Sequence, residues 1–513
     1  MLGRADDLTR GRLLARNVGL NLAGWVLPAL VALAALPALL RSMGEARFGL
    51  LSLAWTLVGY FSLFDLGVGR ALTQALAERL GRDAQEDSPA LTWTALWLLL
   101  LFGLACGAVI AAAAPALATR GLTVPAGLQA ETTTAVRLLA LAVPPMILTS
   151  GLRGVLEAGQ QFRTINMLRV PLGVLTFGGP LAAQLVSHEL PLSVGVLVAA
   201  RVLLFVLHAV LVVRLYPRLR HVHPPRRTHL RRLWRSAGWM TVSSVVSPVL
   251  VFADRFAVGA LLPVAAVAHY TAASEVATKM WLFTAALIPV LFPAIAATRL
   301  REPARAAALF DRGVRVTVLA VLPAALVLVL FAHEGLARWM SPAFAHDAAP
   351  VLKWLAVAVF ANCLAQLPYA VIQGGGRADL AARLHLLELP VYLALLWALL
   401  GRFGLLGVAV AWTARMVVDG VAMLACMRRV LPEADRAVRA ATRLMLGGAA
   451  ALAAATVPAP LGVRVAVALL ALPGIALIGW SRLLTAEERV SARALVRRVL
   501  GRPAPADSAV SAV

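Results

Sequence analysis

The stretch RLYPRLRHVHPPRRTHLRRLWR, residues 214–235, decides how this chain is organised. It holds eight arginines, three histidines and a Pro-Pro pair between two long apolar runs. A segment this basic cannot lie in hydrocarbon, so it must lie in water or at lipid headgroups. It also stands near the middle of the 513-residue chain, and the sequences on its two sides resemble each other. We therefore expect a linker between two related halves.

The composition is that of a membrane protein, with 61% hydrophobic and only 14% charged residues and a mean hydropathy of +0.82. One membrane-spanning helix needs about 20 apolar residues. The sequence predicts an all-α polytopic membrane protein with about 14 transmembrane helices, approximately at residues 19–40, 48–77, 91–114, 135–157, 165–186, 191–213, 237–262, 267–297, 314–332, 350–372, 380–400, 404–427, 441–457 and 461–480.

The net charge of +23 follows this topology. With the N-terminus taken as cytoplasmic, the segments on that side carry 33 of the 48 Lys and Arg residues, the other side carries eight, and seven lie within spans. Such a bias is the positive-inside pattern, and the even number of spans places both termini in the cytoplasm. We therefore expect membrane lipids, and not nucleic acid, as the partner of the basic charge.

Four short matches relate the two halves in order. Gly24-Trp25 matches Gly238-Trp239, GVLEAGQQ at 154–161 matches AVIQGGGR at 370–377, MLRVPL at 167–172 matches LLELPV at 386–391, and Ala200-Arg201-Val202 matches Ala414-Arg415-Met416. The offsets of 214 to 219 residues predict two parallel six-span repeats. We expect five parts: the first lobe, the basic linker, the second lobe, an appended helix pair and an amphipathic cytoplasmic tail, at residues 1–213, 214–236, 237–430, 431–482 and 483–513.

Catalytic and metal-binding motifs are absent from the sequence. It has no Walker A motif, no paired carboxylates in a loop and no metal-spaced His/Cys cluster, and its three cysteines lie in apolar runs. No loop is long enough to form an extramembrane catalytic domain. We therefore expect a transporter rather than an enzyme, with no cofactor and no metal.

Ionisable residues within the predicted spans are candidates for function, because such residues normally face a cavity or a partner. Arg201 and Arg415 occupy equivalent places in the two halves, so we expect them to face each other across the repeat interface and to bind an anionic substrate. Three pairs spaced four residues apart can also neutralise each other locally, namely Arg153/Glu157, Glu275/Lys279 and Arg415/Asp419.

Two acids lie at opposite depths of the membrane, each close to an arginine. Asp65 precedes Arg70 in the inner half, and Asp254 precedes Arg255 in the outer half. Since the chain has no ATP-binding motif, directional transport would draw on an ion gradient, and these acids are our candidates for ion coupling. An ion pair between Asp65 and Arg70 is the structural alternative.

Four stretches resemble the bacterial Wzx-type oligosaccharide flippases, which share a superfamily with the multidrug (MATE) exporters and the lipid II flippase MurJ. They are residues 48–78 (FGLLSLAWTLVGYFSLFDLGVGRALTQALAE), 154–162 (GVLEAGQQF), 253–280 (ADRFAVGALLPVAAVAHYTAASEVATKM) and 371–397 (VIQGGGRADLAARLHLLELPVYLALLW). The resemblance covers about residues 15–430. It implies a V-shaped two-lobe bundle in the bacterial cytoplasmic membrane.

The resemblance also implies a substrate and a mechanism. The substrate is an undecaprenyl-diphosphate-linked oligosaccharide, moved from the inner to the outer leaflet by way of a cationic cavity. A proton or sodium gradient drives the movement, and a polysaccharide polymerase or export protein is a possible partner. The charged residues of this chain that fall in the stretches resembling the flippases, and to which the resemblance extends a role in transport, are Asp65, Arg70, Asp254, Arg255 and Lys279.

Two other classes remain open. A MATE-like antiporter of drugs and cations predicts a cavity dominated by acids, and the buried arginines argue against it. A membrane polymerase or ligase of glycans needs a large outward loop, which the short loops here do not provide. A third possibility is a relative that has lost transport, which only an assay separates from a flippase.

Overall fold

The computed structural model describes residues 11–63, 67–81, 87–299 and 301–483, and within these ranges it consists of helices joined by loops and turns, with no strand. The helices are α1 (Gly11–Leu63), α2 (Val68–Gly81), α3 (Ser88–Ala116), α4 (Gln129–Ala158), α5 (Phe162–Ala183), α6 (Leu190–Leu215), α7 (Arg227–Leu261), α8 (Ala265–Ala277), α9 (Trp281–Thr298), α10 (Pro303–Leu330), α11 (Ala332–Trp339), α12 (Pro342–Gly374), α13 (Ala378–Met427), α14 (Asp435–Ala454) and α15 (Leu461–Ile478). The all-α prediction is confirmed.

The predicted spans lie on these helices. Eight stretches of the described chain are long and apolar enough to cross a membrane. Two of them lie on α1 and α13, each of which is interrupted by non-helical backbone, at Gly44 in α1 and at Gly404 in α13. Gly44 lies between the predicted spans 19–40 and 48–77, and Gly404 is the first residue of the predicted span 404–427. Helix α13 therefore holds two of the expected passes. Helix α1 holds the first and only part of the second, whose predicted range also includes residues 64–66, outside the described residues, and most of α2. The number fourteen itself stays a prediction.

Gly404 shows how one such reversal is made. Its φ of 56° lies in the left-handed region, where residues with a side chain are strained. Three residues later, a Cβ on Gly407 would lie 2.0 Å from the Leu399 carbonyl oxygen, so only glycine permits this approach. The turn folds the second part of α13 back against the first, and the two parts together build one wall of the site described below.

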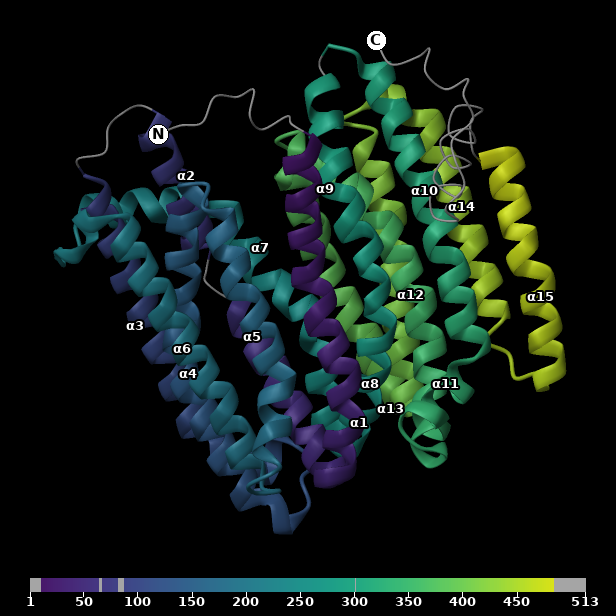
Figure 1. Ribbon diagram of the computed structural model, residues 1–513, viewed down its shortest axis with the longest axis horizontal. Helices are drawn as coiled ribbons and strands as arrows, with labels where there is room; N and C mark the ends of the chain where they lie inside the picture. The colour runs from purple at the N-terminus through teal and green to yellow at the C-terminus, as the bar shows by residue number, and fades with distance from the viewer. Residues whose placement is uncertain (1–10, 64–66, 82–86, 300, 484–513) are drawn as a thin grey trace.

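The helices form two groups (Figure 1). Helices α2–α6 lie on one side and α8–α15 on the other, with the first part of α1 between them. The groups meet near the lower end of Figure 1 and separate toward its upper end. The described chain starts and ends at this upper end, in α1 and after α15, as an even number of passes requires.

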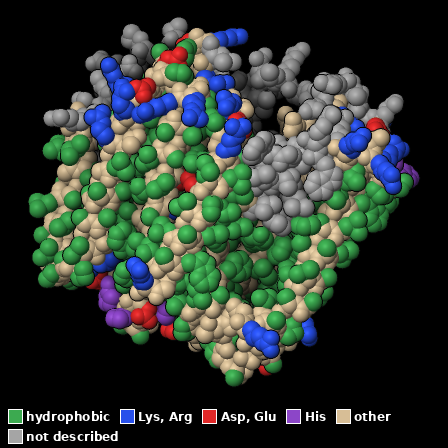
Figure 2. All heavy atoms as spheres, turned by 180° about the vertical axis from the view of Figure 1, so that it is seen from behind, with side chains coloured by type: hydrophobic (Ala, Val, Ile, Leu, Met, Phe, Trp, Pro, Cys, Tyr) green, Lys and Arg blue, Asp and Glu red, His purple; other side chains and the backbone are tan. Residues whose placement is uncertain are grey.

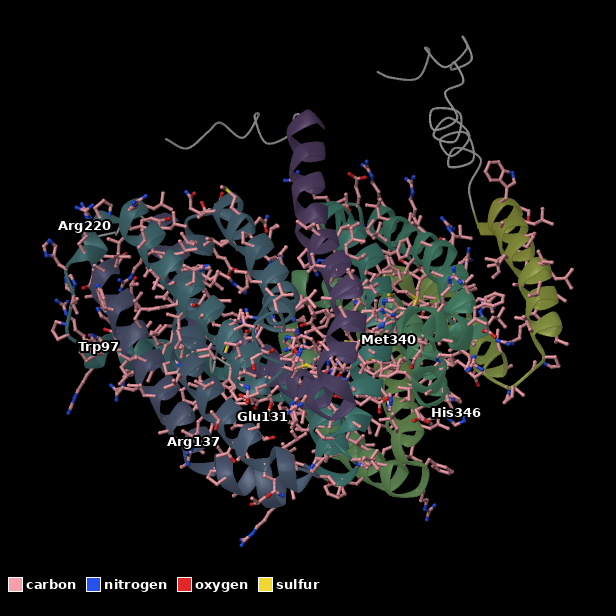
Figure 3. All side chains as sticks on the ribbon, turned by 60° about the horizontal axis from the view of Figure 1, so that its bottom comes forward. Trp97, Glu131, Arg137, Arg220, Met340 and His346 are labelled. Carbon is pink, nitrogen blue, oxygen red and sulfur yellow. The ribbon has the colours of Figure 1, made fainter. Side chains whose placement is uncertain are left out.

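The surface charge agrees with a membrane orientation. Figure 2 shows Lys and Arg side chains gathered along the upper rim above a broad hydrophobic band. Arg220 of the linker lies at the opposite end of the molecule from Arg137 and His346 (Figure 3). The expected inside and outside segments therefore lie at opposite ends.

The basic linker is fastened to α3. The indole nitrogens of Trp93 and Trp97 donate hydrogen bonds to the carbonyl oxygens of Leu219 and His223, both at 3.2 Å. Asp87 lies 2.9 Å from an Arg226 guanidinium nitrogen and 3.1 Å from the His229 ring. Burial lowers the pKa of His229, so it is more often neutral than an exposed histidine. Helix α7 begins within the predicted linker, at Arg227.

The two groups of helices close against each other at the lower end. The backbone N–H of Thr123 donates to the Gly259 carbonyl (3.0 Å), and that of Val264 donates to the Thr123 carbonyl (3.3 Å). Beside them, the Val264 carbonyl oxygen would lie 2.1 Å from a Cβ on Gly49. By the predicted orientation this closed end is the outer one.

The appended pair α14 and α15 is held at the same outer end. Arg464 of α15 pairs with Glu334 of α11, with nitrogen–oxygen distances of 2.6 and 2.8 Å. These hydrogen bonds lower the pKa of Glu334, so the pair stays charged at neutral pH. Most apolar side chains of α15 remain uncovered by protein, as expected for a helix that faces lipid.

We predict that cysteine labelling will confirm the orientation. In a chain without its three native cysteines, Thr228→Cys should be shielded in intact cells from a membrane-impermeant thiol reagent. Ser187→Cys and Ala343→Cys should label, because they lie at the closed, outer end. Labelling of Thr228→Cys from outside would reverse the whole topology.

We also predict that Gly49→Ala will open the outer end. The added methyl would lie 2.1 Å from the Val264 carbonyl oxygen, so the two groups of helices could not close there. Spin labels at positions 187 and 343 should show a longer distance population than in the parent protein. Gly447→Ala is the matched control because a Cβ there meets nothing within 4 Å. Equal distances in both variants would contradict this account of the closure.

Candidate functional site

Three of the predicted residues line one cavity in the second half of the chain. Its volume is about 500 Å³, and it lies among α7, α8, α12 and α13. Asp254 and Arg255 of α7 and Arg415 of α13 are on its wall, together with uncharged polar side chains such as Asn362 and Gln366. We call this space the C-half cavity.

Asp254 is the most enclosed acid of the C-half cavity, with 2% of its surface exposed. One carboxylate oxygen accepts a hydrogen bond from the Tyr270 hydroxyl at 2.5 Å, and the other accepts from the Arg255 backbone N–H at 2.8 Å. The Arg255 guanidinium lies 3.8 Å from the same carboxylate.

Arg415 pairs with a different acid from the one predicted. Its Nε lies 3.7 Å from Glu388 Oε2, and its guanidinium group lies over the Tyr392 ring, 5.5 Å from the centroid. Asp419 instead lies 3.6 Å from the His385 ring nitrogen. The expected Arg415/Asp419 pair is wrong, because the turn at Gly404 brings the first part of α13, and with it Glu388, against Arg415.

The other two local pairs are confirmed. Lys279 Nζ lies 2.7 Å from Glu275, and Arg153 lies 3.0 Å from Glu157. Glu275 is on the wall of the C-half cavity, whereas Lys279 reaches the cavity only through this pair.

Arg201 lies in a second, smaller cavity of about 170 Å³ in the first half of the chain. Arg153, Arg169 and His208 share its wall, along with Ser62, Thr149 and Ser150. Arg201 donates a hydrogen bond to the Thr176 hydroxyl at 3.2 Å. Its buried Nε has no hydrogen-bond partner, and no acid among the described residues pairs with it. We call this space the N-half cavity.

The expectation that Arg201 and Arg415 face each other across the repeat interface is therefore wrong. Arg201 lies in the N-half cavity and Arg415 in the C-half cavity. Each arginine stands on the sixth predicted span of its half and enters the bundle of that same half. The repeat gives the two arginines equivalent positions in their own halves, but these positions do not face each other.

The repeat also relates the two cavities to each other. At the offset of 216 residues, Met146, Thr149, Ser150 and Arg153 correspond to Asn362, Ala365, Gln366 and Tyr369, and all eight residues line their respective cavities. At the offset of 219, Arg169 corresponds to Glu388. Three arginines line the N-half cavity, and one of them, Arg153, pairs with Glu157. The C-half cavity and its border hold four acids (Asp254, Glu275, Glu388 and Asp419) together with Arg255, Arg415 and Lys279.

The remaining predicted residues and the missed ones complete the site. Arg70 is exposed on α2 and lines neither cavity, and Asp65 lies outside the described residues. His385 and Tyr270 were missed. The spacing of His385 and Glu388, three residues apart on one predicted span, was the available signal for His385.

A model of the polysaccharide biosynthesis protein family matches residues 14–299. A putative O-antigen transporter from Shigella flexneri is 29% identical over 406 residues, which are 79% of this chain and 96% of that protein.

Two solved structures are similar in fold. The lipid II flippase MurJ in an inward closed conformation has a TM-score of 0.65 at 12% identity, covering 92% of this chain and 99% of its own. An inward-facing multidrug resistance MATE family transporter of the MOP superfamily has a TM-score of 0.62 at 14% identity, covering 85% of this chain and 99% of its own. Both of these structures are inward conformations of those proteins.

We predict that Arg415→Gln will destabilise the protein more than Arg415→Gln combined with Glu388→Gln. The single change leaves the buried Glu388 carboxylate without its cation, and breaking a buried pair costs about 3–5 kcal/mol. The double variant removes both charges and should therefore recover most of the lost thermal stability. The melting temperatures are measured in detergent with a chelator present. A double variant as unstable as the single one would show that the two residues are not a pair.

Proposed function

We propose that this chain, which belongs to the polysaccharide biosynthesis protein family and has the fold of the MOP exporters, flips lipid-linked oligosaccharides. The family, the Shigella relative and the fold shared with MurJ together support a membrane flippase rather than an enzyme. The substrate in this proposal is an undecaprenyl-diphosphate-linked oligosaccharide. It moves from the inner to the outer leaflet of the bacterial cytoplasmic membrane, toward a polysaccharide polymerase or export partner.

The observation that carries this proposal is the N-half cavity with its arginines. A diphosphate is best bound by guanidinium groups, because each presents two parallel N–H donors to phosphate oxygens. Arg153, Arg169 and Arg201 converge on this one space, and Arg201 has no acidic partner among the described residues. A desolvated cation of this kind gains most from an anionic ligand. Arg255, Lys279 and Arg415 are paired with acids, as Arg153 is with Glu157. The proposal therefore rests first on Arg201, and we assign the paired cations of the C-half cavity a secondary role in binding.

Direction in this proposal comes from the closure at the outer end. The protein receives the lipid headgroup from the cytoplasmic side while Thr123, Gly259 and Val264 hold the outer end shut. Opening the outer end then releases the headgroup to the other leaflet. A proton or sodium ion entering at Asp254 or Asp65 would reset the cycle.

We predict that Arg201→Gln will reduce flipping of a fluorescent polyprenyl-diphosphate disaccharide in proteoliposomes about tenfold or more. Loss of a charge-assisted hydrogen bond costs roughly 1.5–3 kcal/mol, and 1.4 kcal/mol corresponds to a factor of ten. Arg201→Lys should restore only part of the rate because it lacks the two-pronged geometry.

Arg338→Gln is the control for this assay, because Arg338 is exposed and lines neither cavity. Normal flipping by Arg201→Gln would contradict the proposed binding site. Transport of organic cations but not of the lipid would favour the MATE-like alternative.

We predict that ion coupling will depend on Asp254, on Asp65 or on both. With an imposed pH or sodium gradient, Asp254→Asn and Asp65→Asn should each be compared with the parent protein for gradient-driven flipping and for lipid binding. A coupling acid, when neutralised, should lose the response to the gradient while lipid binding persists. Gradient dependence that survives both substitutions would remove the two acids from the mechanism.

A further inference from the structure

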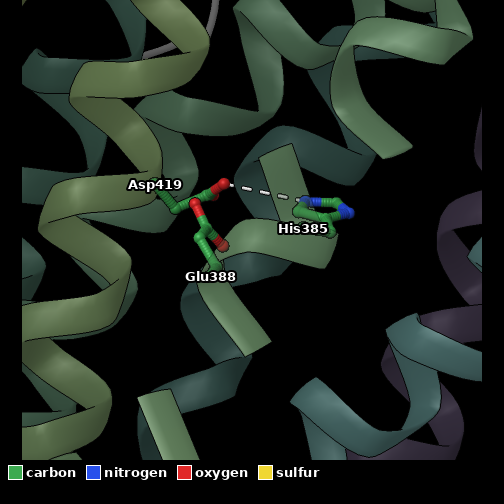
Figure 4. Close-up of side chains that lie close together, drawn as sticks. All are labelled: His385, Glu388 and Asp419. Carbon is green, nitrogen blue, oxygen red and sulfur yellow. Dashed lines mark ion pairs between the residues drawn. The ribbon is translucent and has the colours of Figure 1, made fainter. Parts of the chain in front are cut away.

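Three side chains on the border of the C-half cavity form a cluster that the proposed flipping cycle does not use. They are His385, Glu388 and Asp419, and one ligand atom of each lies within 4.8 Å of the others (Figure 4). His385 and Glu388 are three residues apart on the first part of α13 and so share a helix face. Asp419 comes from the second part, after the turn at Gly404.

The two carboxylates of this cluster are buried, and some of their oxygens have no hydrogen-bond partner. The Glu388 side chain is 8% exposed, and neither of its oxygens accepts a hydrogen bond. Asp419 is 6% exposed, and its Oδ1 likewise has no hydrogen-bond partner. The nearest cations are Arg415 Nε, 3.7 Å from Glu388, and the His385 ring, 3.6 Å from Asp419. Two buried carboxylates this close need a proton or a cation between them, and the ligand atoms around them show which of the two the cluster can hold.

The donor set identifies the class of cation. Alkali and alkaline-earth ions prefer oxygen ligands, whereas an imidazole nitrogen with two carboxylates suits divalent ions such as Zn²⁺ and Mn²⁺. The Tyr369 ring is stacked on His385, with centroids 6.2 Å apart and planes 25° apart, and this restrains the imidazole. His385 and Asp419 also line the C-half cavity, which gives an ion and its waters a way in.

We infer that His385, Glu388 and Asp419 bind one divalent transition-metal ion. The equivalent positions of the first half cannot form the same site, because they are Asn166, Arg169 and Phe205 at offsets of 219, 219 and 214. The ion also competes with Arg415 for Glu388. Its binding would therefore release the Arg415 guanidinium toward the cavity.

The test is a binding titration on the purified full-length protein, stripped with EDTA and freed of any polyhistidine tag. Zn²⁺ binding is followed by competition with a chromophoric chelator, and Mn²⁺ binding by the electron paramagnetic resonance signal of the free ion. We expect one saturable site per chain that a large excess of Na⁺ does not displace. His385→Gln and Asp419→Asn should each weaken binding by about tenfold or more.

Glu275→Gln is the matched control, since Glu275 is an acid of the same cavity that is already neutralised by Lys279. It should bind the metal like the parent protein, and gel filtration should show all variants folded. If a variant fails to fold, X-ray absorption spectroscopy of the zinc-loaded parent protein identifies the ligands of the zinc directly. We expect an imidazole among them.

Three results would overturn the inference: no saturable metal binding, equal binding in the His385 and Asp419 variants, or a zinc shell without imidazole. Proton uptake by the two carboxyls without metal binding would identify a proton site in place of a metal site. None of these results bears on the flipping proposal, which rests on the N-half cavity.

Discussion

A charged side chain inside a membrane protein must be paired or must face a polar cavity, and the two halves of this chain meet that constraint differently. In the second half, Arg415 pairs with Glu388 and Asp254 with Arg255. In the first half, the residue equivalent to Glu388 is Arg169, which lines the N-half cavity together with Arg201 and with Arg153, the partner of Glu157. The sign of the charge at this repeat-related position therefore differs between the two cavities, and our proposals give them different ligands.

The glycines that shape the backbone are not among the residues that line the two cavities. Glycines permit the reversals at Gly44 and Gly404, and Gly49 lets the chain approach Val264 closely at the closed end. The reversal at Gly404 nevertheless shapes the C-half cavity, because it brings the two parts of α13 together on one wall.

Hydropathy and charge in the sequence were enough to predict the helical membrane fold. They could not predict ion pairs between residues that a reversal of the chain direction brings together. Arg415 and Asp419 are four residues apart, so a local pair was the natural expectation, yet the turn at Gly404 brings Glu388 closer. The expectation that Arg201 and Arg415 face each other was wrong for a related reason. Equivalence in the repeat fixes the position of a residue but not the direction of its side chain.

Photocrosslinking tests the central claim, that the arginines of the N-half cavity bind the diphosphate, most directly. A polyprenyl-diphosphate disaccharide with a photoreactive group beside the diphosphate is irradiated with the purified protein, and the labelled peptides are identified by mass spectrometry. This account predicts labelling of α4, α5 and α6 that excess unlabelled lipid diphosphate prevents. Labelling confined to α7–α13, or labelling that the unlabelled lipid does not reduce, would contradict it.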